Sequence, residues 1–261
     1  MNGRRSLPDT WAGREVIAVS PHPDDLAFSA FTLRSVVSLA SVSVLSIFTR
    51  SLWAPRISSR RDEEFVSALR NQEDQEWCNR IGVQRKAFQI PDASLRGYND
   101  ITEREQMLKV DQAERLLDNQ LDRFPENCIV FCPLAIGSHI DHVIVRNVII
   151  ERFRSNSTKK MTLVLYEDLP YAFEFGSARV SEYAQAFAPE AVPWFVGSAG
   201  DLSSKLNALR IYESQIREED LLAVSKYTTQ LVAIGNALER WWVIDRFINH
   251  NTFFGDNNGT R

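Results

Sequence analysis

The sequence has no long hydrophobic run. No unbroken apolar stretch in its 261 residues approaches the roughly 18 residues that a membrane-spanning helix needs. We therefore expect no transmembrane segment. Residues 1–11 contain Arg4 and Arg5 but no apolar segment after them, which is not the pattern of a secretory signal. These features predict a cytoplasmic protein.

Cysteine is scarce as well. The three cysteines, Cys78, Cys128 and Cys132, are too few for a disulfide framework. Cys128 and Cys132 belong to the apolar run CIVFC, where buried thiols act as small hydrophobic side chains. This usage agrees with a reducing compartment.

The net charge is small. Thirty Lys and Arg residues against 34 Asp and Glu residues give a formal charge of -4. This balance argues against a nucleic-acid partner, because such proteins bind by neutralising phosphates with clustered basic side chains. We expect a small-molecule ligand instead, and the sequence does not indicate an oligomeric state.

The first two thirds of the chain alternate between short β-type runs and longer helical stretches. The predicted strands are Glu15–Ser20, 41–49, 86–90, 128–134 and Thr162–Tyr166, and the predicted helices are 26–39, 60–81, 103–123 and 142–154. Gly82 is the expected C-cap of the second helix. Such alternation predicts an α/β fold, a Rossmann-like three-layer sandwich with a mostly parallel central sheet.

The last third is less regular. Residues 201–217 and 219–241 are predicted to be helical. With no internal repeat and no low-complexity linker, we expect a single domain over residues 1–261. Its core would cover about 14–217, with a C-terminal helical extension at 218–255.

Two polar clusters follow predicted strands. The first is PHPDD at 21–25 and the second is HIDH at 139–142, and together they contain three of the four histidines. The carboxyl ends of parallel strands lie at one edge of a sheet, so the two clusters are expected to meet there. The fourth histidine, His250, is expected to be a surface or core residue.

The residue types suit one catalytic divalent cation. Zinc favours imidazole and carboxylate ligands and keeps one position open for water. We assign His22, Asp25 and His142 as the ligands; iron(II) accepts the same donors.

The remaining side chains of the two clusters suit proton transfer around that cation. Asp24 then acts as general base toward water. His139, as imidazolium, would stabilise an oxyanion and protonate the leaving nitrogen, and Asp141 would orient an imidazole.

Each cluster also has a simpler interpretation. The first could be a turn in which Pro23 restricts φ and Asp24 or Asp25 caps the following helix. The two histidines at 139 and 142 could be solvated or capping residues. The metal site is favoured because two separate clusters would have to follow strand ends by coincidence.

The two clusters resemble the metal motifs of the PIG-L/LmbE-like family of zinc-dependent N-deacetylases. RNQE at 70–73, RIGV at 80–83 and residues 205–215 are similar to further family segments. The resemblance implies a Rossmann-like fold and removal of an N-acetyl group, usually from an N-acetylglucosamine moiety. It also implies the same ligands, base and acid as above, with Arg70 helping to shape the substrate pocket. A surface salt bridge between Arg70 and Glu73 is the alternative role.

The sequence departs from the family pattern near the first motif. Leu26 stands where many relatives have Glu, and Ala30-Phe31 where they often have two glycines, so we expect a different pocket floor. The loop after the second strand contains Trp53, which could stack on a sugar, close the pocket or simply pack. The expected substrate is an N-acylated amino sugar or a larger specialised-metabolite intermediate.

Two other functions compete. A catalytically silent binding or scaffold protein would keep the fold, but Asp24 and His139 are both present. A different metal-dependent hydrolase is the third hypothesis; a phosphatase usually needs two metals or a denser basic pocket.

Overall fold

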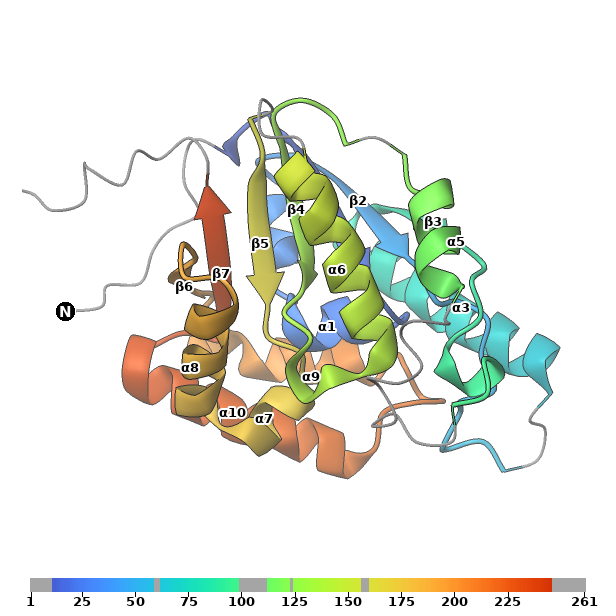
Figure 1. Cartoon of the computed structure of the whole chain (residues 1–261). Coiled ribbons are helices and arrows are strands. Elements are labelled where there is room, and N and C mark those ends of the chain that lie inside the picture. Colours follow the sequence, from blue (N-terminus) through green and yellow to red (C-terminus); the bar gives the residue numbers. More distant parts are fainter. Residues whose placement is uncertain (1–10, 59–61, 99–111, 123, 156–159, 246–261) are drawn as a thin grey trace, which may run out of the picture.

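In the computed structural model, residues 11–58, 62–98, 112–122, 124–155 and 160–245 are described. Within them, seven strands form one sheet in the order β3-β2-β1-β4-β5-β7-β6 (Figure 1). The strands are β1 (Glu15–Ser20), β2 (Ser41–Ser46), β3 (Gln84–Ala87), β4 (Cys128–Pro133), β5 (Thr162–Tyr166), β6 (Val192–Val196) and β7 (Glu239–Asp245).

Helices connect the strands and cover the sheet. The α-helices are α1 (Asp25–Ser29), α2 (Leu33–Val36), α3 (Glu63–Ile81), α5 (Ala113–Gln120), α6 (Ile140–Ser155), α7 (Tyr171–Phe175), α8 (Ser177–Phe187), α9 (Leu202–Leu209) and α10 (Glu218–Gly235). Short 3₁₀ turns are η2 (Ala93–Leu95), η3 (Ile136–Ser138) and η4 (Ala199–Asp201). None of these helices is long and apolar enough to cross a membrane.

The direction in which the chain winds changes beside β1. The chain runs from β1 outward to β2 and β3, then returns to place β4 on the other side of β1. These strands and β5 are parallel. Right-handed crossovers in opposite directions put helices on opposite faces of the sheet, so the predicted three-layer α/β fold is confirmed. The gap between the carboxyl ends of β1 and β4 is where ligands bind in such sheets.

The central strands are hydrophobic on both faces. Every residue of β4 and β5 is buried, as expected for parallel strands covered by helices on both sides. Trp241 and Trp242 of β7 are buried too. Gly82 ends α3 with φ of 76°, the left-handed conformation predicted for it.

The predicted helix at 26–39 is wrong in its middle. The chain leaves the helical path between α1 and α2, where the backbone N–H groups of Phe31 and Thr32 donate to the carboxylate of Glu239 at 2.9 and 3.1 Å. A tertiary acceptor thus replaces the helical one. The predicted helix at 103–123 falls partly outside the described residues, which contain its later part as α5.

The C-terminal prediction is also wrong in part. The helix expected at 219–241 ends at Gly235, and Glu239–Asp245 is a strand that lies antiparallel between β5 and β6. The described part of the segment 218–255 therefore contributes to the sheet instead of forming a purely helical extension. His250 lies outside the described residues.

Candidate functional site

The loop after β1 brings His22 and Asp25 into the gap beside β4. The side chain of Asp25 accepts a hydrogen bond from the backbone N–H of His22 at 2.7 Å, which closes a tight turn. Asp24 occupies the N-cap position of α1 but makes no capping hydrogen bond with its side chain. The capping interpretation of this motif therefore does not account for Asp24.

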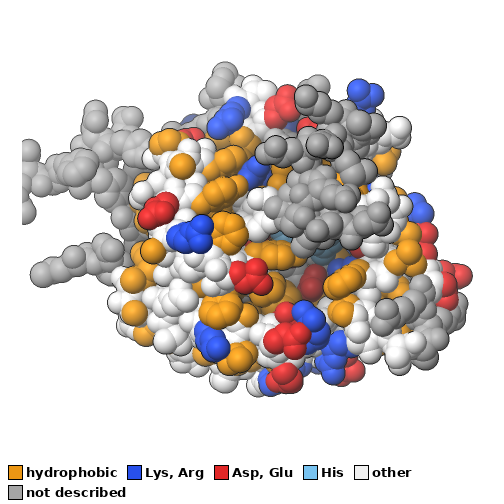
Figure 2. All heavy atoms as spheres, turned by 60° about the horizontal axis from the view of Figure 1, so that its bottom comes forward, with side chains coloured by type: hydrophobic (Ala, Val, Ile, Leu, Met, Phe, Trp, Pro, Cys, Tyr) orange, Lys and Arg blue, Asp and Glu red, His pale blue; other side chains and the backbone are white. Residues whose placement is uncertain are grey.

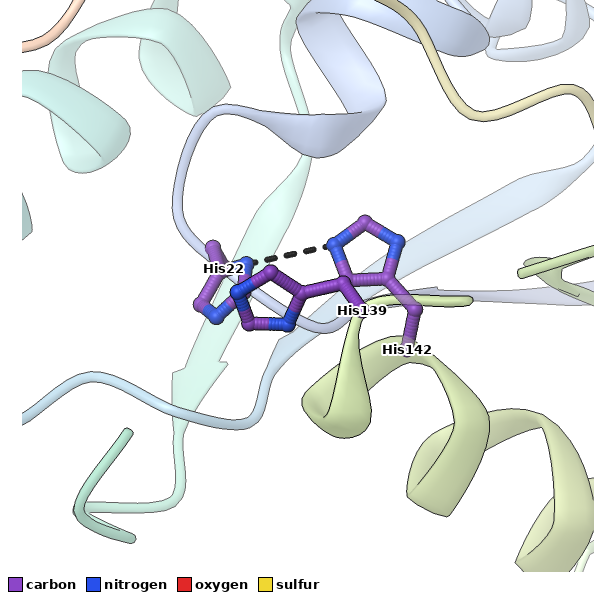
Figure 3. Close-up of side chains that lie close together, drawn as sticks. All are labelled: His22, His139 and His142. Atoms are coloured by element: carbon purple, nitrogen blue, oxygen red, sulfur yellow. Dashed lines mark hydrogen bonds between the residues drawn. The ribbon is translucent and has the colours of Figure 1, made fainter. Parts of the chain in front are cut away.

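The turn before α6 supplies His139 and the first turn of α6 supplies His142 (Figure 3). Nε2 of His142 lies 3.3 Å from Nδ1 of His22, although 120 positions separate the two residues. The His139 ring lies beside both, with centroids 4.8 Å from His22 and 5.2 Å from His142. The structure thus brings together the two clusters that the sequence predicted to meet.

Asp25 completes a triangle of ligand atoms. Its Oδ2 is 3.5 Å from Nδ1 of His22 and 3.3 Å from Nε2 of His142. Ligands about 2.0–2.1 Å from a tetrahedral zinc ion are separated by about 3.3–3.4 Å. These three donors, the set predicted from the sequence, therefore fit one cation.

The outer nitrogen of each of these two imidazoles is held by a carboxylate. Nε2 of His22 is 2.8 Å from Asp141, and Nδ1 of His142 is 2.7 Å from Asp168. When these nitrogens carry the protons, the inner nitrogens present lone pairs to each other and to Asp25. Three converging acceptors repel one another unless a cation or protons lie between them, so the donor set fits a metal.

His139 could also belong to a metal-binding group. Ligand atoms of His22, His139 and His142 all lie within 4.8 Å of one another. This separation is wider than that in the triangle with Asp25. Nδ1 of His139 accepts the backbone N–H of Asp141 at 3.2 Å, which leaves Nε2 to carry the proton.

Neighbouring charges strongly shift the pKa values of His22 and Asp25. Burial by itself would lower the pKa of His22, but its hydrogen bonds to Asp141 and Asp25 raise that pKa to about 10. Burial disfavours the Asp25 carboxylate, yet His142 and His22 outweigh it and lower the pKa of Asp25 to about 2. Positive charge among these three side chains is therefore stabilised.

His139 behaves differently from its neighbours. Burial and the adjacent His22 lower the pKa of His139 well below its usual value, so its neutral form is favoured. The imidazolium form that we expected from the sequence is thus disfavoured here. A neutral imidazole still donates one hydrogen bond through Nε2.

The Asp24 carboxylate makes no hydrogen bond to another of the described residues. Its closest cation is Arg70, whose Nη2 is 3.7 Å away. Burial and the neighbouring Asp25 raise the pKa of Asp24 above its ordinary value. A carboxylate with a raised pKa at the wall of a cavity is suited to accept a proton.

Arg70 is a buried residue of α3, so the alternative of a surface salt bridge to Glu73 is wrong. Its side chain donates to Ser51 at 2.7 Å and lies 3.5 Å from Asp92, in addition to its contact with Asp24. Glu73 accepts from the backbone and hydroxyl of Ser214 instead. Arg70 therefore fixes the side of the cavity next to Asp24.

All the predicted site residues line one cavity of about 390 Å³. Further lining residues are Phe28, Pro55, Asp92, Ala93, Ser94, Tyr98, Leu169, Pro170, Tyr171, Glu174, Gln215, Ile216, Arg217 and Asp220. Trp53 is 59% exposed at its mouth. In Figure 2, the pale blue of histidine lies in a hollow on the face that is at the bottom of Figure 1. Leu26, Ala30 and Phe31 are not among the residues that line this cavity, so the expectation that they form a different pocket floor is wrong for its described lining.

Sequence reasoning missed Asp168 and Tyr171. Asp168 follows β5 as the two motifs follow β1 and β4, so the same rule could have found it. Tyr171 begins α7, and its ring lies 6.0 Å from that of His142. No pattern in the sequence connects it with the motifs.

The loop that carries His139 has an unusual backbone. Ala135, Gly137 and Ser138 have φ values of 61°, 76° and 55°. A Cβ on residue 137 would lie 2.8 Å from Cβ of Tyr171, so only glycine fits there. Such local strain clusters at functional sites.

Known proteins resemble this chain in sequence and fold. Residues 17–153 match the family described as PIG-L: GlcNAc-PI de-N-acetylase. A 2'-N-acetylparomamine deacetylase from Streptomyces fradiae is 31% identical over 224 residues, which cover 82% of this chain and 78% of that protein.

Two solved structures show the fold at lower identity. A deacetylase–teicoplanin complex from the biosynthesis pathway of teicoplanin has a TM-score of 0.65 at 20% identity, covering 88% of this chain and 98% of that one. The N,N'-diacetylchitobiose deacetylase from Pyrococcus horikoshii has a TM-score of 0.55 at 16% identity, covering 93% and 88%.

Proposed function

This chain belongs to the PIG-L family, and we propose that it is a metal-dependent hydrolase that removes an N-acetyl group from an amino sugar or a related small molecule. One observation carries the proposal: His22, Asp25 and His142 present three ligand atoms 3.3–3.5 Å apart at the floor of a cavity. The matched deacetylase from Streptomyces fradiae supports the reaction class.

We assign zinc as the cation, held by His22, Asp25 and His142. Imidazole and carboxylate donors suit zinc, although they also suit iron(II). When bound, the cation would polarise the amide carbonyl and make a water molecule more acidic. Asp141 and Asp168 keep the two imidazoles in the tautomers that ligation needs.

Asp24 is assigned as the general base. Its carboxylate lines the cavity next to Asp25, and its raised pKa favours proton uptake from water during attack on the amide. His139 is assigned as a hydrogen-bond donor through Nε2 to the developing oxyanion. The proton that Asp24 accepts from water can then pass to the leaving nitrogen.

Arg70 and Trp53 are assigned to substrate binding. Arg70 is immobilised by Ser51 and Asp92 and faces the cavity beside Asp24. The exposed Trp53 ring at the mouth offers an apolar face on which a sugar can lie. The cavity volume of about 390 Å³ falls within the range of roughly 300–1,000 Å³ typical of small-molecule sites.

Acetate release tests the proposal directly. We expect the purified protein to contain about one zinc or iron ion per chain and to release acetate from N-acetylated amino sugars. A chelator should abolish release, and added zinc or iron(II) should restore it. A protein that holds the metal yet releases no acetate from such compounds would favour a silent binding module instead.

A further inference from the structure

The charges that line the cavity are unequal. The described lining residues include six carboxylates and two guanidinium groups. The carboxylates are Asp24, Asp25, Asp92, Asp141, Glu174 and Asp220, and the guanidinium groups are those of Arg70 and Arg217. Among the lining residues that the structure describes, negative side chains therefore outnumber positive ones before any metal is counted.

Both guanidinium groups already have acidic partners. Arg70 lies between Asp24 and Asp92, as described above. Arg217 pairs with Glu219 at 2.8 Å and with Asp220 at 3.4 Å. A phosphate-bearing substrate would thus find no unpaired cation among the described lining residues.

Glu174 is different from the other carboxylates. It is exposed, and its carboxylate has neither a hydrogen bond nor an ion pair with another described residue. It lies one helical turn after Tyr171 in α7, so both side chains lie on the same side of that helix and line the cavity. The Tyr171 ring lies beside the rings of His139 and His142, whereas Glu174 lines an exposed part of the cavity.

Aromatic faces accompany this carboxylate. The rings of Trp53, Tyr98 and Tyr171 line the same cavity. Aromatic faces attract cations and also pack against the apolar faces of sugars. Together with an unpaired carboxylate, they therefore favour a sugar that carries a positive charge.

We infer that Glu174 binds an ammonium group of the substrate, and that the preferred substrate is an amino sugar with a free amine in addition to its N-acetyl group. This inference rests on the proposed deacetylation and specifies its substrate class. The acetamido group would lie at the histidines while the ammonium group reaches Glu174. The residue sets specificity and takes no part in the bond cleavage.

A matched pair of substrates tests the inference. One is the methyl glycoside of N-acetylglucosamine, and the other is its analogue with an amino group in place of the primary hydroxyl. We expect the metal-loaded protein to prefer the amino compound in kcat/KM by roughly threefold to tenfold, the range of a partly exposed ion pair. Glu174→Gln should remove most of this preference through KM, and added salt should weaken it.

Glu182→Gln is the control, because it makes the same charge change on an exposed residue of α8 that does not line the cavity. It should keep the preference. Equal kcat/KM for the two compounds, or a preference that survives in Glu174→Gln, would overturn the inference.

Binding of the two glycosides, measured by calorimetry, separates this inference from the proposed function. If neither compound is hydrolysed but the amino compound binds more tightly and loses that advantage in Glu174→Gln, deacetylation fails and the ammonium site stands. If both are hydrolysed but bind equally, the ammonium site fails and deacetylation stands. If neither is hydrolysed and both bind equally, both proposals fail.

Discussion

At the residue scale, the site depends on pairs of side chains. His22 is held by Asp141 and His142 by Asp168, so each imidazole has one nitrogen directed outward to a carboxylate and one directed inward. Asp141 also accepts the backbone N–H of Ala93 and lies 2.7 Å from Arg96. These contacts limit rotation of the rings before any ligand arrives.

Asp24→Asn should lower turnover by about 10²-fold or more while the metal content stays the same, because the amide cannot accept the proton from water. Steady-state kinetics of acetate release, with elemental analysis of the same samples, measures both. Unchanged turnover would remove Asp24 from the role of base.

Asp168→Asn should weaken metal affinity by about 10–100-fold, since His142 loses the carboxylate that fixes its tautomer. Competition with a chromophoric chelator measures the affinity. Asp122→Asn, at an exposed residue that pairs with Lys86, is the control and should change nothing. His142→Ala should lose the metal altogether. If His142→Ala keeps one ion per chain, the proposed ligand set is wrong.

The sequence predicted the site residues that lie within motifs, but it did not predict the residues that hold those side chains in place. His22, Asp25 and His142 could be chosen because zinc chemistry restricts the ligand types. Asp168 follows a predicted strand, but its pairing with His142, like that of Asp92 with Arg70, was not predictable, because these residues meet only in the folded chain.

At the scale of elements, the turn between β4 and α6 is the most constrained segment of the site. It must place His139 and His142 together, and it does so with left-handed residues and a glycine pressed against Tyr171. The hydrophobic pattern predicted both flanking elements, but it contains no information on the path of the turn.

Gly137→Ala should destabilise the protein by more than about 1 kcal/mol and also reduce turnover. The added Cβ would lie 2.8 Å from Tyr171 and force it or the His139 turn to move. Urea unfolding and acetate release measure the two effects.

Gly13→Ala provides the matched control for that substitution. Gly13 also has positive φ, but nothing lies within 4 Å of its added Cβ. It should lose about 1 kcal/mol of stability at most and keep full turnover. If both variants lose the same stability and turnover, the contact between residue 137 and Tyr171 does not contribute to function.

At the scale of the whole molecule, Glu239 joins distant parts of the chain. It begins β7, accepts from Phe31 and Thr32 between α1 and α2, and lies 2.7 Å from Nζ of Lys205 in α9. Lys205 is fully buried. The C-terminal strand is thereby connected to the helix that follows the first metal motif.

Lys205→Met should cost about 3–5 kcal/mol of unfolding free energy, because it leaves the Glu239 carboxylate buried without its cation. Adding Glu239→Gln to this variant should recover part of the loss. Lys86→Met removes an exposed ion pair with Asp122 and should cost far less, because water screens that pair. Chemical denaturation compares the three proteins; a similar small cost for Lys205→Met and Lys86→Met would contradict this account.

The parallel half of the sheet was predictable because each strand-helix unit is local in sequence. β7 was not, because its partners β5 and β6 are selected by long-range pairing, and its sequence continues an apolar helical pattern. The division of the chain into a core and an extension stays a prediction.

The late position of β7 has a consequence during synthesis on the ribosome. Among the described strands, β6 pairs with the sheet only through β7, so until residues 239–245 emerge, the Thr162–Tyr166 strand is an open edge of mostly apolar residues. Open hydrophobic edges recruit other chains. The protein is therefore expected to be most vulnerable to aggregation, and most dependent on chaperones, for as long as β7 has not yet emerged to cover this edge.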